Sequence, residues 1–295
     1  MKLIENLPIS VLRILSSICK YCPKLILTLR NYRWTHTLIN WKEPQNLQEY
    51  IFKLIIDSCS DKTKRRELAD MADKIAVRKY VTEIIGSEYL PRLLGTWDNV
   101  DDINWESLPN AFAIKTNNGC GTNIIVRDKS KLNIDEAKSK LKRWLKFPYG
   151  QLSGQPQYSD IPPKILAEEL LIQDENPEAL PYDYKFFCFK GEPRFILFYE
   201  GRTVNGHITF NRVYDINWQP IDSIVRRPSN HDIPRPKSFD EMLEAVKKLC
   251  RGLEFVRVDM YDIKGKPVFG EMTFTPDVTI NFTDEFLKDS MKFLD

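Results

Sequence analysis

The stretch from 256 to 273, VRVDMYDIKGKPVFGEMT, most constrains how this chain can fold, because it reads as two strands that pair with each other. Its outgoing run alternates with the period of two of a half-buried strand, with Val256, Val258 and Met260 on one face and Arg257, Asp259 and Tyr261 on the other. The return run sets Val268 and Met272 against Phe269, Glu271 and Thr273. Between them, DIKGK includes Gly265, which can adopt positive φ in a turn. We therefore expect a β-hairpin with one apolar face and one face that carries charge.

The register of this hairpin decides whether its two acids meet. We expect a loop with an odd number of residues, such as the five of DIKGK, and a register that places Asp259 opposite Glu271 and Arg257 opposite Thr273. The expected apolar pairs are Val258 with Gly270 and Met260 with Val268. Cβ atoms of directly opposed residues lie about 5 Å apart. The hairpin is thus predicted to bring two carboxylates into contact range.

Two facing carboxylates repel each other unless a cation lies between them. A solvent-facing hairpin with scattered charges would explain Asp259, Glu271 and Arg257 without any site. The alternative is a divalent metal site, and magnesium is usually held by one or two carboxylates plus substrate phosphates. The metal hypothesis therefore requires a phosphate-binding element elsewhere in the chain.

The segment AFAIKTNNGCGTNIIVRD supplies a candidate for that element. Residues 111–115 and 123–127 are predicted to be strands, joined by a loop that is rich in Asn and Gly. Such a loop can expose backbone N–H groups to phosphate, although an ordinary hairpin turn has the same composition. Lys115, directly before the loop, favours the phosphate interpretation. Neither GxGxxG nor GxxxxGK[ST] occurs, so Rossmann and P-loop sites are not supported.

Other segments contribute further candidates. The apolar strand KILAEELL (164–171) carries adjacent acids, Glu168 and Glu169, which could bind adenine or ribose or could simply be solvated. A second hairpin is expected over 184–199, with Asp183 and Lys185 on one face. Residues 203–236 are expected to be irregular. The arginines in and beside them could receive an anionic substrate or could serve local packing: Arg202, Arg212, Arg226, Arg227 and Arg235.

Apolar periodicity predicts helices over 47–56, 64–85 and 135–145. A long loop is expected over 146–163, where Pro, Gly, Tyr and Gln are frequent, and such a loop could order over a substrate.

Composition excludes several classes of protein. The chain has 295 residues and a formal net charge of +2, which is not the signature of a nucleic-acid-binding protein. Its six cysteines are scattered, as in a reduced cytosolic protein, and Cys19 and Cys22 form a lone CxxC without a second pair. With three histidines in the chain, histidine-based catalysis and metal binding are poorly supported.

Residues 8–34 combine Leu, Ile and Val with five basic residues. No apolar run in them reaches the roughly 18 to 20 residues that cross a bilayer, and no signal-peptide cleavage site follows. A helix that packs on the following domain is the favoured interpretation. A basic amphipathic segment on an anionic membrane surface is the alternative.

Taken together, the segments resemble one known family. ADKIAVRKYV, AIKTNNGCGTNIIV, the helix NIDEAKSKLKRWL, YDYKFFCFKGEPRFI and FVRVDMYDIKGKPVFGEMTFTP occur in this order between Leu68 and Pro276. In that order they resemble the TupA-like ATP-grasp family, which is associated with teichuronopeptide and other bacterial surface polysaccharide synthesis. The resemblance implies an α+β ATP-grasp fold with two lobes that enclose ATP. On it, residues 1–66 would be a helical N-terminal extension and 67–295 the ATP-grasp domain, with lobes at about 107–165 and 166–295.

The resemblance also implies roles for individual residues. Lys74 and Lys115 would contact phosphates, and Arg257 would steady the transferred phosphoryl group. Asp259 and Glu271 would bind Mg²⁺, with Thr273 or Asn281 as the third ligand. The remaining nucleotide contacts would come from Asn118, Gly119, Cys120, Gly121, Thr122, Glu168, Glu169, Leu170, Leu171, Asp183 and Lys185.

The implied activity is that of an ATP- and Mg²⁺-dependent carboxylate–amine ligase that acts through an acyl-phosphate in cell-surface polysaccharide synthesis, with Lys115 and Arg257 as catalytic residues. The acceptor carboxylate or glycan precursor is not identified by the sequence. The alternatives are a kinase of a sugar or lipid-linked hydroxyl, a glycosyltransferase, and a non-catalytic scaffold of polysaccharide assembly. The expected location is the cytoplasm of a bacterium, or the inner face of its membrane if residues 8–34 bind there.

Overall fold

The computed structural model describes residues 7–172, 180–200, 210–226, 228 and 233–294. They form two compact units, each built from non-contiguous parts of the chain. The first comprises residues 1–30, 55–78 and 91–170, and the second comprises residues 31–54, 79–90 and 171–295. The mixed helices and antiparallel sheets confirm the α+β class, whereas the expected domain boundaries stay a prediction.

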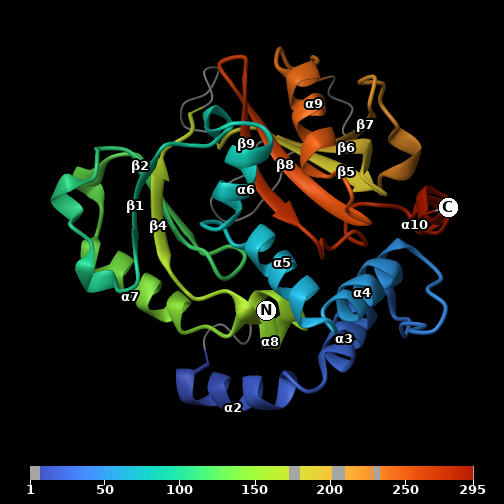
Figure 1. Ribbon diagram of the computed structural model, residues 1–295, viewed down its shortest axis with the longest axis horizontal. Coiled ribbons are helices and arrows are strands. Elements are labelled where there is room, and N and C mark those ends of the chain that lie inside the picture. Colours follow the sequence, from blue (N-terminus) through green and yellow to red (C-terminus); the bar gives the residue numbers. More distant parts are fainter. Residues whose placement is uncertain (1–6, 173–179, 201–209, 227, 229–232, 295) are drawn as a thin grey trace. The chain divides into compact units, whose positions relative to one another are not determined.

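The first unit contains a four-stranded antiparallel sheet in the order β1-β4-β2-β3 (Figure 1). Its strands are β1 (Leu93–Trp97), β2 (Phe112–Thr116), β3 (Asn123–Val126) and β4 (Ile165–Glu169). One face of this sheet packs against α7 (Ile134–Leu145), whose Ala137 and Leu141 join the core with Phe112 and Ile114. The opposite face carries Lys115 and Glu168. Alternation along β2 and β4 thus separates a core face from a charged face.

Two short helices occupy the stretch where a long loop was expected. These are α8 (Tyr149–Ser153) and the 3-10 helix η5 (Pro156–Asp160), so the prediction of a loop over 146–163 was wrong. α8 packs against α2 (Ile9–Cys19), and η5 packs against α5 (Lys62–Ala72). Leu12, Phe147 and Leu152 form the buried centre of the α2–α8 contact. Neighbours distant in sequence, rather than local periodicity, hold this stretch in helical form.

The helix expected over 64–85 is two helices. α5 ends at Ala72 and α6 (Val77–Ile84) begins after a break at 73–76. Asp73, the C-cap of α5, has an extended backbone, and its Oδ1 accepts a hydrogen bond from the Ile75 N–H at 2.8 Å. Such a local side-chain bond competes with helical bonding. Lys74 therefore lies in a turn.

The second unit contains a five-stranded antiparallel sheet in the order β7-β6-β5-β8-β9 (Figure 1). Its strands are β5 (Asp183–Phe189), β6 (Glu192–Glu200), β7 (Phe210–Asp215), β8 (Phe255–Ile263) and β9 (Lys266–Thr273). One face packs on α9 (Phe239–Leu249), where the rings of Phe186 and Phe239 stack at 6.2 Å between centroids. The other face carries charges at one end of the strands and an aromatic cluster at the other. Phe187, Phe195 and Phe282 lie in that cluster, near α10 (Asp284–Asp289).

The region expected to be irregular, 203–236, contains β7. Its described arginines form ion pairs within the second unit: Arg212 pairs with Asp222, Arg226 with Asp284 and Arg235 with Asp240. This supports the local-packing interpretation, while Arg202 and Arg227 lie outside the described residues. The other α-helices of the described residues are α3 (Pro23–Thr35) and α4 (Leu47–Ser58). None of the described helices is long and apolar enough to cross a membrane.

Candidate active site

Asn117 anchors the loop that joins β2 and β3, which we call the glycine loop (residues 117–122). Its Nδ2 donates to Asp73 Oδ1 at 2.9 Å and to the Pro162 carbonyl at 3.0 Å. Its Oδ1 accepts from the Lys164 N–H at 2.7 Å, and its own N–H donates to the Lys164 carbonyl. Asn117 is buried, and its position is therefore determined by hydrogen bonds on every polar atom of its side chain.

The rest of the glycine loop is shaped by Lys74 and Tyr149. Lys74 Nζ donates to the Gly119 carbonyl at 2.6 Å, so the lysine expected to bind phosphate lies at this loop. A Cβ at Gly119 would be 3.4 Å from the Tyr149 ring, and Gly121 has a φ of +74°. Asn118 is buried, and its Oδ1 has no hydrogen-bond partner among the described residues. A buried polar atom without a partner is costly, and a bound ligand would satisfy it.

Lys115 and Arg78 share one buried carboxylate on the charged face of the first sheet. Lys115 Nζ lies 2.5 Å from Glu168 Oε2, and Arg78 Nη1 lies 2.6 Å from Glu168 Oε1. Register explains this contact, because Glu168 pairs with Ala113 and is therefore a diagonal neighbour of Lys115. Together with Lys74, which binds the glycine loop, the three cations and one acid carry two formal positive charges.

The four residues at the end of β4 that are expected to contact the nucleotide have different environments. Glu168 is buried between the two cations, whereas Glu169 is exposed at the end of β4. Leu170 and Leu171 follow β4 without regular structure and are partly buried. Their assignment to the nucleotide stays a prediction.

A row of charged side chains crosses three neighbouring strands of the second sheet. Lys185 on β5 pairs with Asp259 on β8, and Asp259 pairs with Glu271 on β9. Asp183 and Arg257 lie two residues along from Lys185 and Asp259 on the same face. We call these five residues the acidic network. The expected pairing of Asp259 with Glu271 and of Arg257 with Thr273 is confirmed.

The route to that pairing differs from the expected one. The turn holds two residues rather than five, because β8 continues to Ile263 and β9 begins at Lys266. Lys264 and Gly265 both have positive φ, as a tight hairpin turn requires. A bulge between Asp259 and Met260 leaves Gly270 on β9 as an extra residue, and this shift by one residue places Glu271 opposite Asp259. The expected apolar pairs were wrong, because they belong to a register two residues away from the one that pairs Asp259 with Glu271. Val258 pairs with Met272, and Met260 pairs with Phe269.

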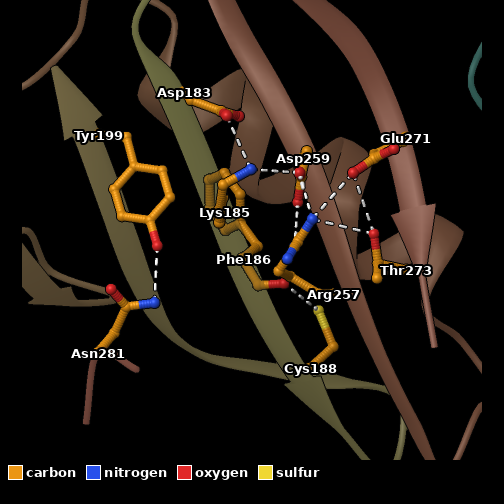
Figure 2. A network of polar contacts seen from close by, with 10 residues as sticks. All are labelled: Asp183, Lys185, Phe186, Cys188, Tyr199, Arg257, Asp259, Glu271, Thr273 and Asn281. Atoms are coloured by element: carbon orange, nitrogen blue, oxygen red, sulfur yellow. Dashed lines mark hydrogen bonds and ion pairs between the residues drawn. The ribbon is translucent and has the colours of Figure 1, made fainter. Parts of the chain in front are cut away.

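Figure 2 shows how the acidic network is connected. Lys185 Nζ bridges Asp183 Oδ2 at 2.7 Å and Asp259 Oδ2 at 2.5 Å. Arg257 donates to both oxygens of Asp259, at 2.6 and 2.7 Å. Its Nη2 also donates to Glu271 Oε1 at 2.9 Å. Three carboxylates thus face two cations, and the network carries one formal negative charge.

Burial and charge perturb the titration of this network. Asp259 is 2% exposed, and burial, aided by the neighbouring carboxylates Asp183 and Glu271, raises its pKa against the lowering effect of Arg257 and Lys185. Burial and Arg257 act to lower the pKa of Lys185, but its three acidic neighbours outweigh them and raise it. Lys185 therefore stays protonated at neutral pH, and the excess negative charge stays on the carboxylates.

Comparison with known proteins decides the family. A family model described as TupA-like ATPgrasp matches residues 53–292. The chain belongs to the TupA-like ATP-grasp family. This confirms the resemblance inferred from the motifs. No curated protein matches the chain.

Solved ligases and a synthetase are among the structures similar to this TupA-like chain. D-alanine–D-alanine ligase from Bacillus anthracis is 16% identical, with a TM-score of 0.43 over 76% of this chain and 63% of that one. The purK N5-carboxyaminoimidazole ribonucleotide synthetase, in an ADP complex, is 13% identical, with a TM-score of 0.40 over 72% of this chain and 47% of that one. The ATP-grasp ligase PsnB is 11% identical, with a TM-score of 0.39 over 72% and 54%. The present chain spans less than two thirds of the length of each.

The donor set of the acidic network fits magnesium. Arg257 Nη2 lies within 2.9 Å of both Asp259 and Glu271, so one cation can contact both carboxylates. Among the described residues no group of three or more His, Cys, Asp and Glu side chains could hold a metal ion. Two carboxylates completed by phosphate oxygens and water are a typical magnesium site. The oxygen-only donors and the excess negative charge suit the same ion.

The two candidates for a third metal ligand have different surroundings. Thr273 Oγ1 donates to Glu271 Oε1 at 3.2 Å and accepts from Arg257. Asn281 Nδ2 donates to the Tyr199 hydroxyl at 2.7 Å (Figure 2). Thr273 therefore lies directly against a predicted ligand, and the choice between the two stays a prediction.

Sequence reasoning did not assign roles to Arg78 and Asn117. Arg78 lies in the quoted motif ADKIAVRKYV, four residues after Lys74, which was the available signal. Its partner Glu168 is 90 residues away in the chain, and Asn117 contacts Asp73 across 44 residues. Contacts of this separation leave no periodic trace in a single sequence.

Proposed function

We propose that this protein is an ATP- and magnesium-dependent enzyme of the carboxylate–amine ligase type. The observation that carries the proposal is the pairing of Asp259 with Glu271 across β8 and β9, with Arg257 in contact with both. Membership of the TupA-like ATP-grasp family supplies the link to ATP. The cations at the glycine loop carry the positive charge that is needed to bind phosphates.

In the proposed mechanism, Lys74 and Lys115 bind phosphate oxygens, and the backbone of residues 118–122 covers them. Asp259 and Glu271 hold magnesium, which when bound neutralises charge on the phosphates during transfer. Arg257 orients the transferred group and offsets its charge, because a guanidinium remains protonated beside two carboxylates. Catalysis by these residues consists of positioning and charge neutralisation rather than of covalent chemistry.

Lys185 acts within this proposal as a support for Asp259. Its Nζ contacts Asp259 Oδ2 from the neighbouring strand β5, whereas Glu271 lies on β9, on the other side of β8. Asp183 binds the same Nζ. All three side chains are buried, so their geometry is fixed before any ligand binds. A preformed carboxylate costs little reorganisation when magnesium arrives.

For the acceptor, the proposal names a chemical class and not a single compound. We propose a carboxylate on a bacterial surface-glycan precursor, phosphorylated by ATP and then attacked by an amine, and we place the reaction in the cytoplasm. The six cysteines form no disulfide, which supports a reducing compartment. The link to surface polysaccharides is supported by the resemblance of the motifs to the TupA-like family, which is associated with their synthesis.

Isothermal titration calorimetry of the purified protein tests the nucleotide part. A non-hydrolysable ATP analogue should bind with magnesium and much more weakly with EDTA. A panel of nucleotide sugars should give no heat of binding. Binding of a nucleotide sugar in place of the ATP analogue would contradict the proposal in favour of a glycosyltransferase.

Phosphate release tests the chemical part. With ATP, magnesium and a candidate uronic acid, phosphate should be released only when an amine is also present. Incorporation of the γ-phosphate of ATP into a hydroxyl acceptor, without phosphate release, would show a kinase instead.

A further inference from the structure

Exposed apolar side chains are concentrated near the N-terminus. Of the fourteen large hydrophobic residues that the described part of the chain exposes, nine lie between Val11 and Leu38. The exposed fraction is 64% for Ile14, 61% for Ile18 and 79% for Tyr21. Scattered single residues of this kind need no explanation, but a concentration in 28 residues marks a surface that binds something.

α2 is apolar over more of its circumference than its packing needs. Leu12 is fully buried against α8, together with Phe147 and Leu152. Val11, Ile14 and Ile18, at spacings of three and four, form a neighbouring stripe that points to solvent. Packing on α8 therefore uses one side of the apolar face and leaves the other uncovered.

α3 repeats this arrangement. Leu27 is buried, whereas Leu25, Leu29 and Tyr32 follow each other at spacings of four and three and are each about half exposed, with fractions of 55%, 58% and 48%. We call these exposed residues of α2 and α3, together with Tyr21 between them, the N-terminal apolar surface. Two successive helices thus each present an apolar stripe with no cover among the described residues.

The charge around this surface has one sign. No Asp or Glu occurs from Leu7 to Lys42. The basic residues in the same stretch are Arg13, Lys20, Lys24, Arg30, Arg33 and Lys42. The whole chain has nearly equal numbers of basic and acidic residues, 43 and 41, whereas this stretch carries basic residues and no acidic ones. Each basic residue close to an anionic membrane contributes attraction in addition to apolar burial.

We propose that the N-terminal apolar surface docks this protein on an anionic lipid bilayer. The helices would lie in the plane of the interface, with Ile14, Ile18 and Leu25 among the acyl chains and the basic side chains at the headgroups. Tyr21 and Tyr32 are residues of the kind that prefers the depth of the headgroups. Docking of this kind needs no spanning helix. The proposal does not depend on the proposed enzymatic activity.

A second copy of this chain suits the surface less well. In a symmetric dimer the same patch faces itself, so the basic residues would meet basic residues. Like charges across an interface cost free energy, while anionic headgroups neutralise them. Charge complementarity therefore selects the bilayer as the occupant.

Vesicle co-sedimentation of the full-length protein tests the proposal. Vesicles of phosphatidylcholine with 30 mol% phosphatidylglycerol, about a third anionic lipid, should bind it on the order of tenfold more tightly than phosphatidylcholine alone, and salt should weaken the binding. The variant Ile14→Ser/Ile18→Ser should lose binding by on the order of tenfold or more, since two exposed apolar side chains leave the interface. Arg13→Gln/Lys20→Gln should weaken binding to the anionic vesicles selectively.

Ile216→Ser/Ile280→Ser is the matched control, because both isoleucines are also exposed, at 38% and 49%, but lie elsewhere in the chain. It should bind vesicles like the wild type. Circular dichroism should show all variants folded, as expected for exposed positions.

The proposal would be overturned if the control variant lost as much vesicle binding as Ile14→Ser/Ile18→Ser, or if binding did not depend on anionic lipid. Light scattering that shows a dimer dissociated by Ile14→Ser/Ile18→Ser, with no vesicle binding by the wild type, would assign the surface to a second copy instead.

Discussion

The cations at the glycine loop and those in the acidic network differ in burial and in how fully acidic groups neutralise them. At the loop, Lys74 and Lys115 are cations whose neighbours are a carbonyl oxygen and one shared carboxylate, and the side chain of Lys115 keeps 24% of its surface exposed. In the network, Lys185 and Asp259 are almost completely buried and each satisfies the other. We therefore expect the loop to tolerate the loss of a cation, whereas the same loss in the network should lower the stability of the fold. Substitutions at the loop are therefore expected to change ligand binding, and substitutions of buried network residues are expected to change the stability of the fold.

Lys185→Ala should break the network and have the largest effect. It leaves the buried Asp183 and Asp259 without their shared cation, which is expected to cost about 3 to 5 kcal/mol of unfolding free energy. Urea denaturation measures the change. Lys79→Ala, at an exposed ion pair with Glu83, is the control and should stay within about 0.5 kcal/mol of wild type. Equal stabilities of the two variants would contradict the structural role assigned to Lys185 in the network.

Glu271→Gln sharpens the comparison, because Glu271 belongs to the network but its side chain is 38% exposed. The fold should survive, while the gain in nucleotide affinity from magnesium should fall by on the order of a hundredfold, since one charged ligand is lost. Calorimetry with and without magnesium measures this. Glu285→Gln, another exposed acid of the second unit, should leave the magnesium effect intact. Retention of the effect in Glu271→Gln would remove Glu271 from the metal site.

Lys115→Ala tests the loop side of the comparison. ATP should bind on the order of ten to a hundredfold more weakly, because a charged hydrogen bond to phosphate is lost, and adenosine should bind nearly as before. Glu168 keeps Arg78 as a partner, so the protein should remain folded. Lys131→Ala, with a largely exposed side chain near the same sheet, is the control. Equal losses of ATP and adenosine affinity would argue against a phosphate contact.

Gly121→Ala is expected to have the smallest effect on stability. A Cβ at Gly121 meets nothing within 4 Å, so the cost is the positive φ alone, about 1 kcal/mol. Gly252→Ala is matched to it, because Gly252 also has positive φ and open space around it. Both variants should lose similar stability in thermal denaturation, but only Gly121→Ala should alter ATP affinity. A change in ATP affinity with both would point to a global effect.

The sequence predicted the elements of both regions better than their connections. Alternation identified β2, β3, β5, β8 and β9 and placed Asp259 opposite Glu271. It did not reveal the two-residue turn and the bulge, because a three-residue loop without a bulge would also place Asp259 opposite Glu271. Motif order identified the family, since five segments in sequence are more specific than any one of them.

Tertiary contacts explain most of what the sequence did not show. The helix break at Asp73 follows from that residue's bonds to Ile75 and Asn117, which periodicity does not register. α8 and η5 form where Pro and Gly suggested a loop, because α2 and α5 pack against them. Arg78 and Asn117 acquired roles through partners that lie far away in the chain.

The bulge in the β8–β9 hairpin makes Gly270 more important than its chemistry suggests. A Cβ at this position would lie 2.9 Å from the carbonyl oxygen of Asp259 and 3.0 Å from the ring of Tyr261. The alignment of the two acids thus depends on a residue that contributes no atom to any ligand. A related chain that kept both carboxylates but replaced this glycine would pass a motif search and still hold its acids out of line.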